Sequence, residues 1–371
     1  MRKEIDSSQL SVFVFIAVMA LKIFMTPGLL IKGAGRDGWI SMLAFVVIEL
    51  VVLFVILLII KLNPQKTLYD VLVSALGKVV AKGILLIFAT LLFVKLIIMC
   101  GELELFFNTS MLKSIDFVVC FIVLLAMLVV FSAKGLRPLA RTAQIFFPFV
   151  LGALLVLFGL TVGNLKLSGL TPISFDMSKI AITMSKFPMW FGDVAVLLIF
   201  MGKTEIRKKF VSKGMLTGVI SSVIVMYFAV VLFAAYGDYP IIIDYGHNIS
   251  NMVVYSSGSY LFGRFDIPIF CIWMIAIFVQ IAVSFYAIVS FLGSAVGKGN
   301  DTVWAIIVAV ALFALCQIFF NSKSELLALG TGIARWLCLV VQIALPAIVL
   351  IVSLINRRKN IDDVQTKKST D

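Results

Sequence analysis

The residues best placed to do chemistry in this sequence are ionisable side chains that interrupt long apolar stretches. Lys22, Glu49, Lys95 and Asp193 lie well inside such stretches, and Glu102 lies nearer the end of one. An ionised side chain at the centre of a bilayer costs at least ~2.5–3.5 kcal/mol, so each needs a partner or a watery cavity. We therefore expect these groups to bind a ligand, to couple to an ion or to form structural ion pairs.

Lys22 is the sharpest candidate, because it precedes Pro27 in a stretch where a broken helix would leave backbone groups unpaired. Its ammonium could bind a carboxylate or occupy the place of a coupling cation; the simpler alternative is that it reaches the interface. Asp193 follows Gly192 and Pro188 in a second such stretch. It could receive an amine, pair with Lys22 or form a plain structural ion pair.

The remaining ionisable residues are expected to form structural ion pairs or to take part in coupling. Lys95 is two helical turns from Glu102, which is too far for a direct pair, so we expect its partner on another helix. Glu49 is expected to be a structural hydrogen-bond partner. Glu102 is expected to be solvated at the interface, and Arg264 and Asp266 are expected to form a local pair there.

The sequence offers little for catalysis. His247 is the only histidine and lies between apolar stretches, and the five cysteines form no C-x-x-C pair. No phosphate-binding loop is present. We expect no enzyme activity, no cofactor, no metal site and no nucleic-acid binding.

The elements that position these residues are predicted to be membrane-spanning helices. The chain has 371 residues, of which 62% are hydrophobic and 13% charged, a composition that excludes a water-soluble globular enzyme. A spanning helix needs ~20 apolar residues. The apolar runs fall at 9–34, 38–60, 80–107, 115–131, 138–162, 178–201, 214–235, 257–292, 302–320 and 332–355.

The distribution of basic residues predicts the orientation of these runs. The chain has 31 Lys and Arg residues and a net charge of +12, and most basic residues lie in segments that share one side if both termini are cytoplasmic. About ten helices fit that arrangement, which requires an even number. We expect one membrane domain over 1–371, made of inverted halves at 9–162 and 178–355, with a basic cytoplasmic tail at 356–371. Pro27 and Pro188 interrupt the first run of each half, which is typical of a transporter-like binding site.

The segment Ile23-Phe24-Met25-Thr26-Pro27-Gly28 resembles the Gly-x-Gly-Ile-Phe-x-x-Pro-Gly signature of the amino acid–polyamine–organocation transporters. That resemblance implies an all-α, LeuT-like 5+5 inverted repeat with broken first and sixth helices. Ala20 and Lys22 stand where the signature has glycines. Those side chains would crowd the capture of a carboxylate by backbone N–H groups, so Lys22 would supply the charge instead.

A more specific resemblance rests on Gln9, Gly35-Arg36-Asp37-Gly38-Trp39-Ile40, Arg207-Lys208-Lys209, Arg264-Phe265-Asp266 and Trp273. With these residues the whole chain resembles the B subunit of the nutrient germinant receptors of endospore-forming bacteria, the spore germination permease family. The resemblance implies a sensor of small nutrients, often amino acids, in the spore inner membrane. It also implies an A subunit and a lipoprotein C subunit as partners.

The ligand pocket implied by the resemblance lies where the first and sixth helices break. Its predicted members are Ala20, Leu21, Lys22, Met25, Thr26, Pro27, Lys95, Trp190, Phe191, Gly192 and Asp193. The expected function is a receptor subunit that binds a nutrient there and triggers germination with its partners. The alternatives are a proton-coupled amino-acid transporter and a passive scaffold or conduit.

Overall fold

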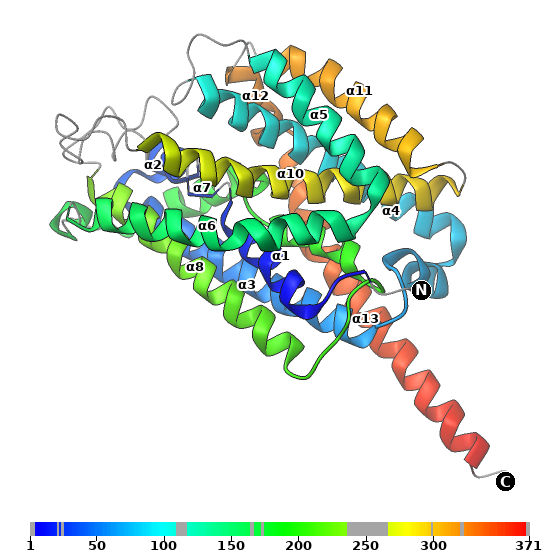
Figure 1. The fold of residues 1–371 in the computed structure, drawn as a ribbon. Coiled ribbons are helices and arrows are strands. Elements are labelled where there is room, and N and C mark those ends of the chain that lie inside the picture. Colours follow the sequence, from blue (N-terminus) through cyan, green and yellow to red (C-terminus); the bar gives the residue numbers. More distant parts are fainter. Residues whose placement is uncertain are drawn as a thin grey trace.

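A computed structural model describes residues 4–20, 22–23, 26–108, 117–163, 167–171, 174–235, 266–297, 300–319 and 323–368. Within these residues the regular elements are helices, and the only β-type pairing is an isolated bridge between Ile5 and Thr204. Figure 1 shows the helices gathered side by side in one bundle, from which the C-terminal part of α13 (Ala334–Lys368) projects.

Eight helical segments in the described chain are long and apolar enough to cross a membrane. The long helices are α3 (Gly38–Leu62), α4 (Leu68–Phe106), α5 (Phe117–Lys134), α6 (Leu136–Val162), α8 (Phe210–Ala235), α10 (Asp266–Val296), α11 (Asp301–Phe319) and α13. Each of them contains most of one expected apolar run.

Some boundaries differ from the sequence prediction. The helix expected to begin at residue 80 begins at Leu68, because Thr67 and Asp70 form a capping box that starts it there. A bend at Gly77, where φ is 79°, separates this added N-terminal part from the expected apolar run. The basic segment expected as a tail continues α13 as helix to Lys368. Two short helices, η3 (Leu167–Leu170) and α12 (Lys323–Thr331), lie where loops were expected.

The runs that contain Pro27 and Pro188 are interrupted. Run 9–34 divides into α1 (Ser7–Met19) and α2 (Thr26–Ala34), which a short 3₁₀ turn, η1 (Gly35–Asp37), joins to α3. Run 178–201 divides into α7 (Met177–Lys186), η4 (Pro188–Trp190) and η5 (Asp193–Phe200). Proline suits the first turn of a helix, where its missing N–H costs nothing, and each element restarts at or just before its proline. Proline alone does not break a helix here, because Pro148 and Pro346 lie inside α6 and α13.

The second interruption also depends on Gly192, which has the left-handed conformation with φ of 72°. A Cβ atom at this position would overlap the side-chain amide of Gln342, which would have to move away from its hydrogen bond to the Phe191 carbonyl. The left-handed backbone conformation is the main reason for glycine here, and the position of Gln342 adds to it.

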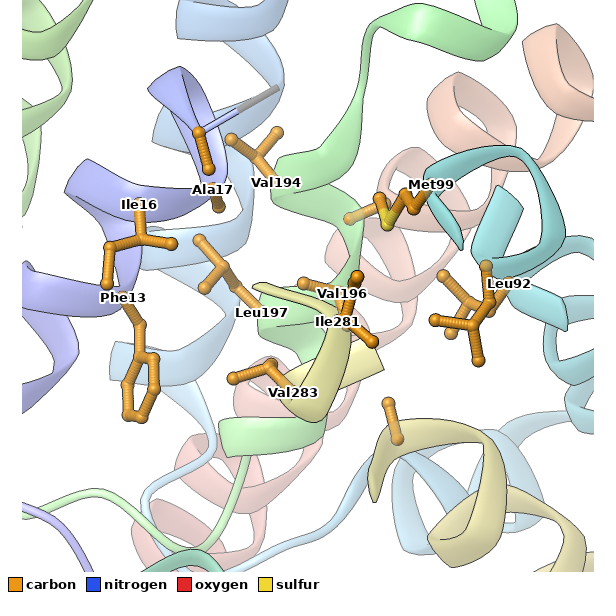
Figure 2. Close-up of a cluster of buried hydrophobic side chains, with 14 of the residues drawn as sticks. Phe13, Ile16, Ala17, Leu92, Met99, Val194, Val196, Leu197, Ile281 and Val283 are labelled. Carbon is orange, nitrogen blue, oxygen red and sulfur yellow. The ribbon is translucent and has the colours of Figure 1, made fainter. Parts of the chain in front are cut away.

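The core of the bundle surrounds η5, whose eight residues are all buried. Figure 2 shows Val194, Val196 and Leu197 of η5 among Phe13 and Ile16 of α1, Leu92 and Met99 of α4, and Ile281 and Val283 of α10. An interrupted segment at the centre of the bundle exposes backbone groups that the surrounding helices must satisfy.

The outer surface of the bundle is apolar. Val119 and Ile122 of α5 and Val303 and Val310 of α11 are more than half exposed to the surroundings of the protein. Soluble proteins rarely expose apolar surface so continuously. This surface fits a multi-pass protein surrounded by the lipid bilayer.

Candidate functional site

Lys22 lies in the gap between α1 and α2, and its side chain folds back onto the end of α1. Its Nζ atom donates hydrogen bonds of 3.1 Å each to the carbonyl oxygens of Ala17 and Val18. These carbonyls belong to the last turn of α1, which leaves its final C=O groups without helical partners. The ammonium therefore caps the helix and interacts favourably with its negative dipole end.

The same ammonium binds two carboxylates from elsewhere in the chain. Lys22 Nζ lies 2.9 Å from Glu49 Oε1 of α3 and 3.2 Å from Asp193 Oδ2 at the start of η5. The three residues are at most 7% exposed. Lys22 thus joins α1, α3 and η5 at the point where both broken runs meet.

Lys95 of α4 approaches Asp193 from the other side. Its Nζ atom lies 2.7 Å from Asp193 Oδ1 and donates a 2.7 Å hydrogen bond to the carbonyl oxygen of Phe191. Gln342 of α13 donates a second bond of 2.7 Å to that same carbonyl oxygen. The backbone freed by the interruption at Phe191 is therefore satisfied by side chains from α4 and α13.

Asp193 is the centre of this arrangement, because each of its carboxylate oxygens faces one lysine. The five buried ionisable residues Lys22, Glu49, Lys95, Glu102 and Asp193 are called the ion cluster below. Breaking one pair in such a buried group costs about 3–5 kcal/mol, because the remaining charge is left without compensation.

Glu102 is buried rather than solvated at the interface, which corrects the sequence expectation. Its exposed fraction is 5%, and its Oε1 atom accepts a hydrogen bond from the indole Nε1–H of Trp190 in η4. The Trp190 ring packs against Gly330 of α12, where a Cβ atom would lie 2.5 Å from the ring. The sequence of the apolar run does not predict that η4 and α12 cover the end of α4, where Glu102 lies.

The aromatic ring of Phe191 forms a further wall of the site. It stacks on Phe45 of α3, with ring centroids 3.8 Å apart and an interplanar angle of 8°. Phe45 is one helical turn before Glu49 on α3, so the stacked rings lie beside the Lys22–Glu49 pair.

The other predicted pocket residues are placed as follows. Ala20 is buried at the end of α1, and Thr26 and Pro27 are buried in the first turn of α2. Leu21, Met25 and Arg264 lie outside the described residues, and Asp266 is the first residue of α10, where its side chain is not described.

Gln342 and Phe45 were missed by sequence reasoning. Gln342 had a usable signal, since an amide inside an apolar run must find a hydrogen-bond partner in a membrane. Phe45 had none, because phenylalanines are frequent throughout the apolar runs. Among the residues that the structure describes, no three or more His, Cys, Asp or Glu side chains are placed to hold a metal ion.

A second polar contact region, the terminal latch, ties the N-terminal segment to the end of η5. The N–H of Glu4 donates to the Lys203 carbonyl at 2.8 Å, and the N–H of Glu205 donates to the Ile5 carbonyl at 2.9 Å. Lys203 Nζ donates a 2.8 Å hydrogen bond to the Tyr286 hydroxyl of α10.

The Lys203 ammonium has an altered acidity in this setting. Burial lowers its pKa below the ordinary lysine value, and attraction from Glu4 and Asp301 opposes that shift only in part. Keeping Lys203 charged in the terminal latch therefore costs free energy of folding, so the contribution of the latch to stability depends on pH.

Two apolar grooves lie away from the ion cluster. One, of about 600 Å³, runs between α3 and α8 past Trp39 and Met226; the other, of about 450 Å³, lies between α6 and α8. Their walls are almost entirely apolar, so they suit lipid chains better than a charged ligand.

The comparison with curated proteins found no match to this chain. A family model described as spore germination protein matches residues 4–325, which include both interrupted runs and the whole ion cluster. The match covers most of the 371 residues, and it agrees with the multi-pass helical architecture. The chain is therefore a member of the spore germination protein family.

Proposed function

We propose that this protein is the B-type subunit of a nutrient germinant receptor, which binds a small nutrient between its two interrupted segments. The observation that carries the proposal is the position of Asp193, whose two carboxylate oxygens bind Lys22 and Lys95 where both segments break. Paired broken segments are the best structural pointer to a binding site in transporter-like folds.

The ion cluster favours a zwitterionic ligand such as an amino acid. An ammonium and a carboxylate on one molecule could enter between Lys95 and Asp193 and replace one ion pair with two. This exchange leaves the net charge of the site unchanged, whereas a singly charged ligand would add an unbalanced charge in the membrane. The Phe45–Phe191 stack supplies an apolar surface beside it.

The proposed architecture is a LeuT-like 5+5 repeat of ten spans in one domain, with both termini cytoplasmic. The eight long helices together with the two interrupted segments support that number. In this proposal the protein resides in the spore inner membrane and acts with an A subunit and a lipoprotein C subunit.

Signalling requires that the ligand bind the active state more tightly than the resting one. Asp193 begins η5, and Lys203 of the terminal latch follows η5. Rearrangement of the ion cluster would therefore shift η5 and alter the hydrogen bonds of the terminal latch. In this proposal the altered latch is the surface that partner subunits detect.

The test uses spores that lack this gene and carry either the native gene or a variant. We expect Lys22→Ala to shift the dose–response to the activating nutrient of an amino-acid panel while the amount of protein in the membrane is unchanged. Lys179→Ala is the matched control, because that side chain is 68% exposed and belongs to α7, away from the cluster. A normal dose–response in Lys22→Ala would refute the role of Lys22, and an unchanged response of the gene deletion would refute the receptor role.

A proton-coupled amino-acid transporter is the second candidate, and the acid-rich ion cluster is the observation that favours it. Counterflow of radiolabelled amino acids in proteoliposomes distinguishes the two. Accumulation that depends on a pH gradient would support transport, and binding without counterflow would support a receptor.

A further inference from the structure

The ion cluster contains more acids than bases. Among the described residues, its acids are Glu49, Asp193 and Glu102, and its bases are Lys22 and Lys95, all buried. Asp37 is also buried, but it lies in η1 before the start of α3, about three helical turns from Glu49, and it accepts hydrogen bonds from Ser174. It belongs to a separate site. If every cluster group were ionised, the cluster would hold one uncompensated negative charge, which a lipid environment strongly disfavours.

The geometry identifies which acid differs from the others. Glu49 and Asp193 each lie within ion-pair distance of a lysine. Glu102 instead accepts a hydrogen bond from the neutral indole N–H of Trp190. A neutral donor can bind a carboxylic acid as well as a carboxylate, since the carbonyl oxygen of the acid still accepts the bond.

Among the described residues, the charged groups that act on Glu102 do not supply the missing cation. Lys95 and Asp193 act on it electrostatically, but they are already paired with each other at 2.7 Å. Cys338 of α13 interacts with the same Lys95–Asp193 pair. Glu325 of α12 is exposed and carries no positive charge.

We propose that Glu102 is a proton-binding site, which holds one exchangeable proton on Oε2 while Oε1 accepts the hydrogen bond from Trp190. The bound proton makes the cluster electrically neutral, with two ammonium groups, two carboxylates and one carboxylic acid. Adding or removing this proton changes the net charge of the ion cluster by one. The change occurs next to Trp190 of η4, which directly precedes the break at Phe191 and Gly192. The site would thereby link protonation to the interrupted segment.

Infrared spectroscopy of the purified protein in detergent tests this assignment without any nutrient. We expect a carboxylic-acid C=O stretching band at neutral pH that shifts in D₂O, is lost in Glu102→Gln and is retained in Glu104→Gln. Glu104 is the matched control, because it lies two residues further along α4 and accepts a hydrogen bond from Asn108 at 2.8 Å outside the ion cluster.

Other outcomes overturn the proposal. Absence of the band from the native protein, or its persistence in Glu102→Gln, would show that Glu102 is ionised. Glutamine has the shape and neutrality of the protonated acid and can still accept from Trp190. Failure of Glu102→Gln to fold, when Glu104→Gln folds, would therefore also contradict a neutral Glu102. Loss of the band on alkaline titration of the native protein supports an exchangeable proton, and this measurement needs no variant.

Discussion

Replacing Asp193 by asparagine should destabilise the protein more than any other single neutral substitution in the ion cluster. The change keeps the shape of the side chain but removes the negative charge that faces both lysines at 3.2 and 2.7 Å. Lys22 keeps Glu49 and two backbone carbonyls, whereas Lys95 keeps, among the described residues, only the carbonyl of Phe191. The loss should therefore come mainly from the uncompensated charge of Lys95.

The expected magnitude follows from this accounting. Removing one partner of a buried ion pair costs about 3–5 kcal/mol. Because each 1.4 kcal/mol is a factor of ten, the folded-to-unfolded ratio should fall about a hundredfold to a few thousandfold. Equilibrium unfolding in detergent micelles, followed by the helical circular dichroism signal, measures this change directly.

A double-mutant cycle with Lys95→Met isolates the pair. Removing both charges leaves nothing unpaired, so Asp193→Asn with Lys95→Met should lose less stability than the two single changes together, by about 0.5–3 kcal/mol. The control cycle combines Lys95→Met with Asp176→Asn, because Asp176 pairs with Lys179 on α7 rather than with Lys95, and should be additive. Additive behaviour in the Asp193 cycle would refute the pairing of Asp193 with Lys95.

Two further substitutions test the interrupted segment and the latch. Gly192→Ala should destabilise the protein by at least about 1–2 kcal/mol in the same unfolding assay, because the left-handed conformation and the contact with Gln342 both oppose a Cβ atom. The control is Gly152→Ala in the interior of α6, where a Cβ atom meets nothing within 4 Å, so this substitution should be neutral or stabilising. Equal effects of the two alanines would contradict the geometry at Gly192. The lowered pKa of Lys203 means that the folded state binds the Lys203 proton less tightly than the unfolded state does. The charged Lys203 therefore destabilises the folded protein below its folded-state pKa. This destabilisation is relieved as the pH rises from the folded-state pKa toward the ordinary lysine value of about 10.4. Lys203→Met should remove that rise in stability from the pH profile of the unfolding midpoint, and an unaltered profile would show that Lys203 is not the titrating group.

The sequence was sufficient to identify most members of the ion cluster, because a charge inside an apolar run must be compensated. Lys22, Lys95 and Asp193 stood out for that reason, and the helix interruptions near Pro27 and Pro188 followed from the chemistry of proline. The partners could not be assigned, because a pairing depends on the rotation of each helix about its axis, and uniformly apolar helices leave that rotation undefined.

The burial of Glu102 could not be inferred from its position in an apolar run. Its position near the end of the run predicted contact with water, but the distance to water depends on what covers the end of the helix. Here η4 brings Trp190 over the carboxylate, and α12 packs behind the indole ring. Both covering elements are short, and their positions come from tertiary contacts that local sequence does not encode.

The 3₁₀ geometry of η5 has a mechanical consequence. A 3₁₀ helix rises ~2.0 Å per residue and an α-helix ~1.5 Å. Conversion of Asp193–Phe200 to α-helix would therefore shorten this eight-residue segment by about 4 Å, because each residue loses about 0.5 Å of rise. Asp193 is held by two lysines at one end, and Lys203 is held by Tyr286 just beyond the other. A change of helix type in η5 would thus convert the loss of a charge contact in the middle of the bundle into a displacement of ångströms at its edge.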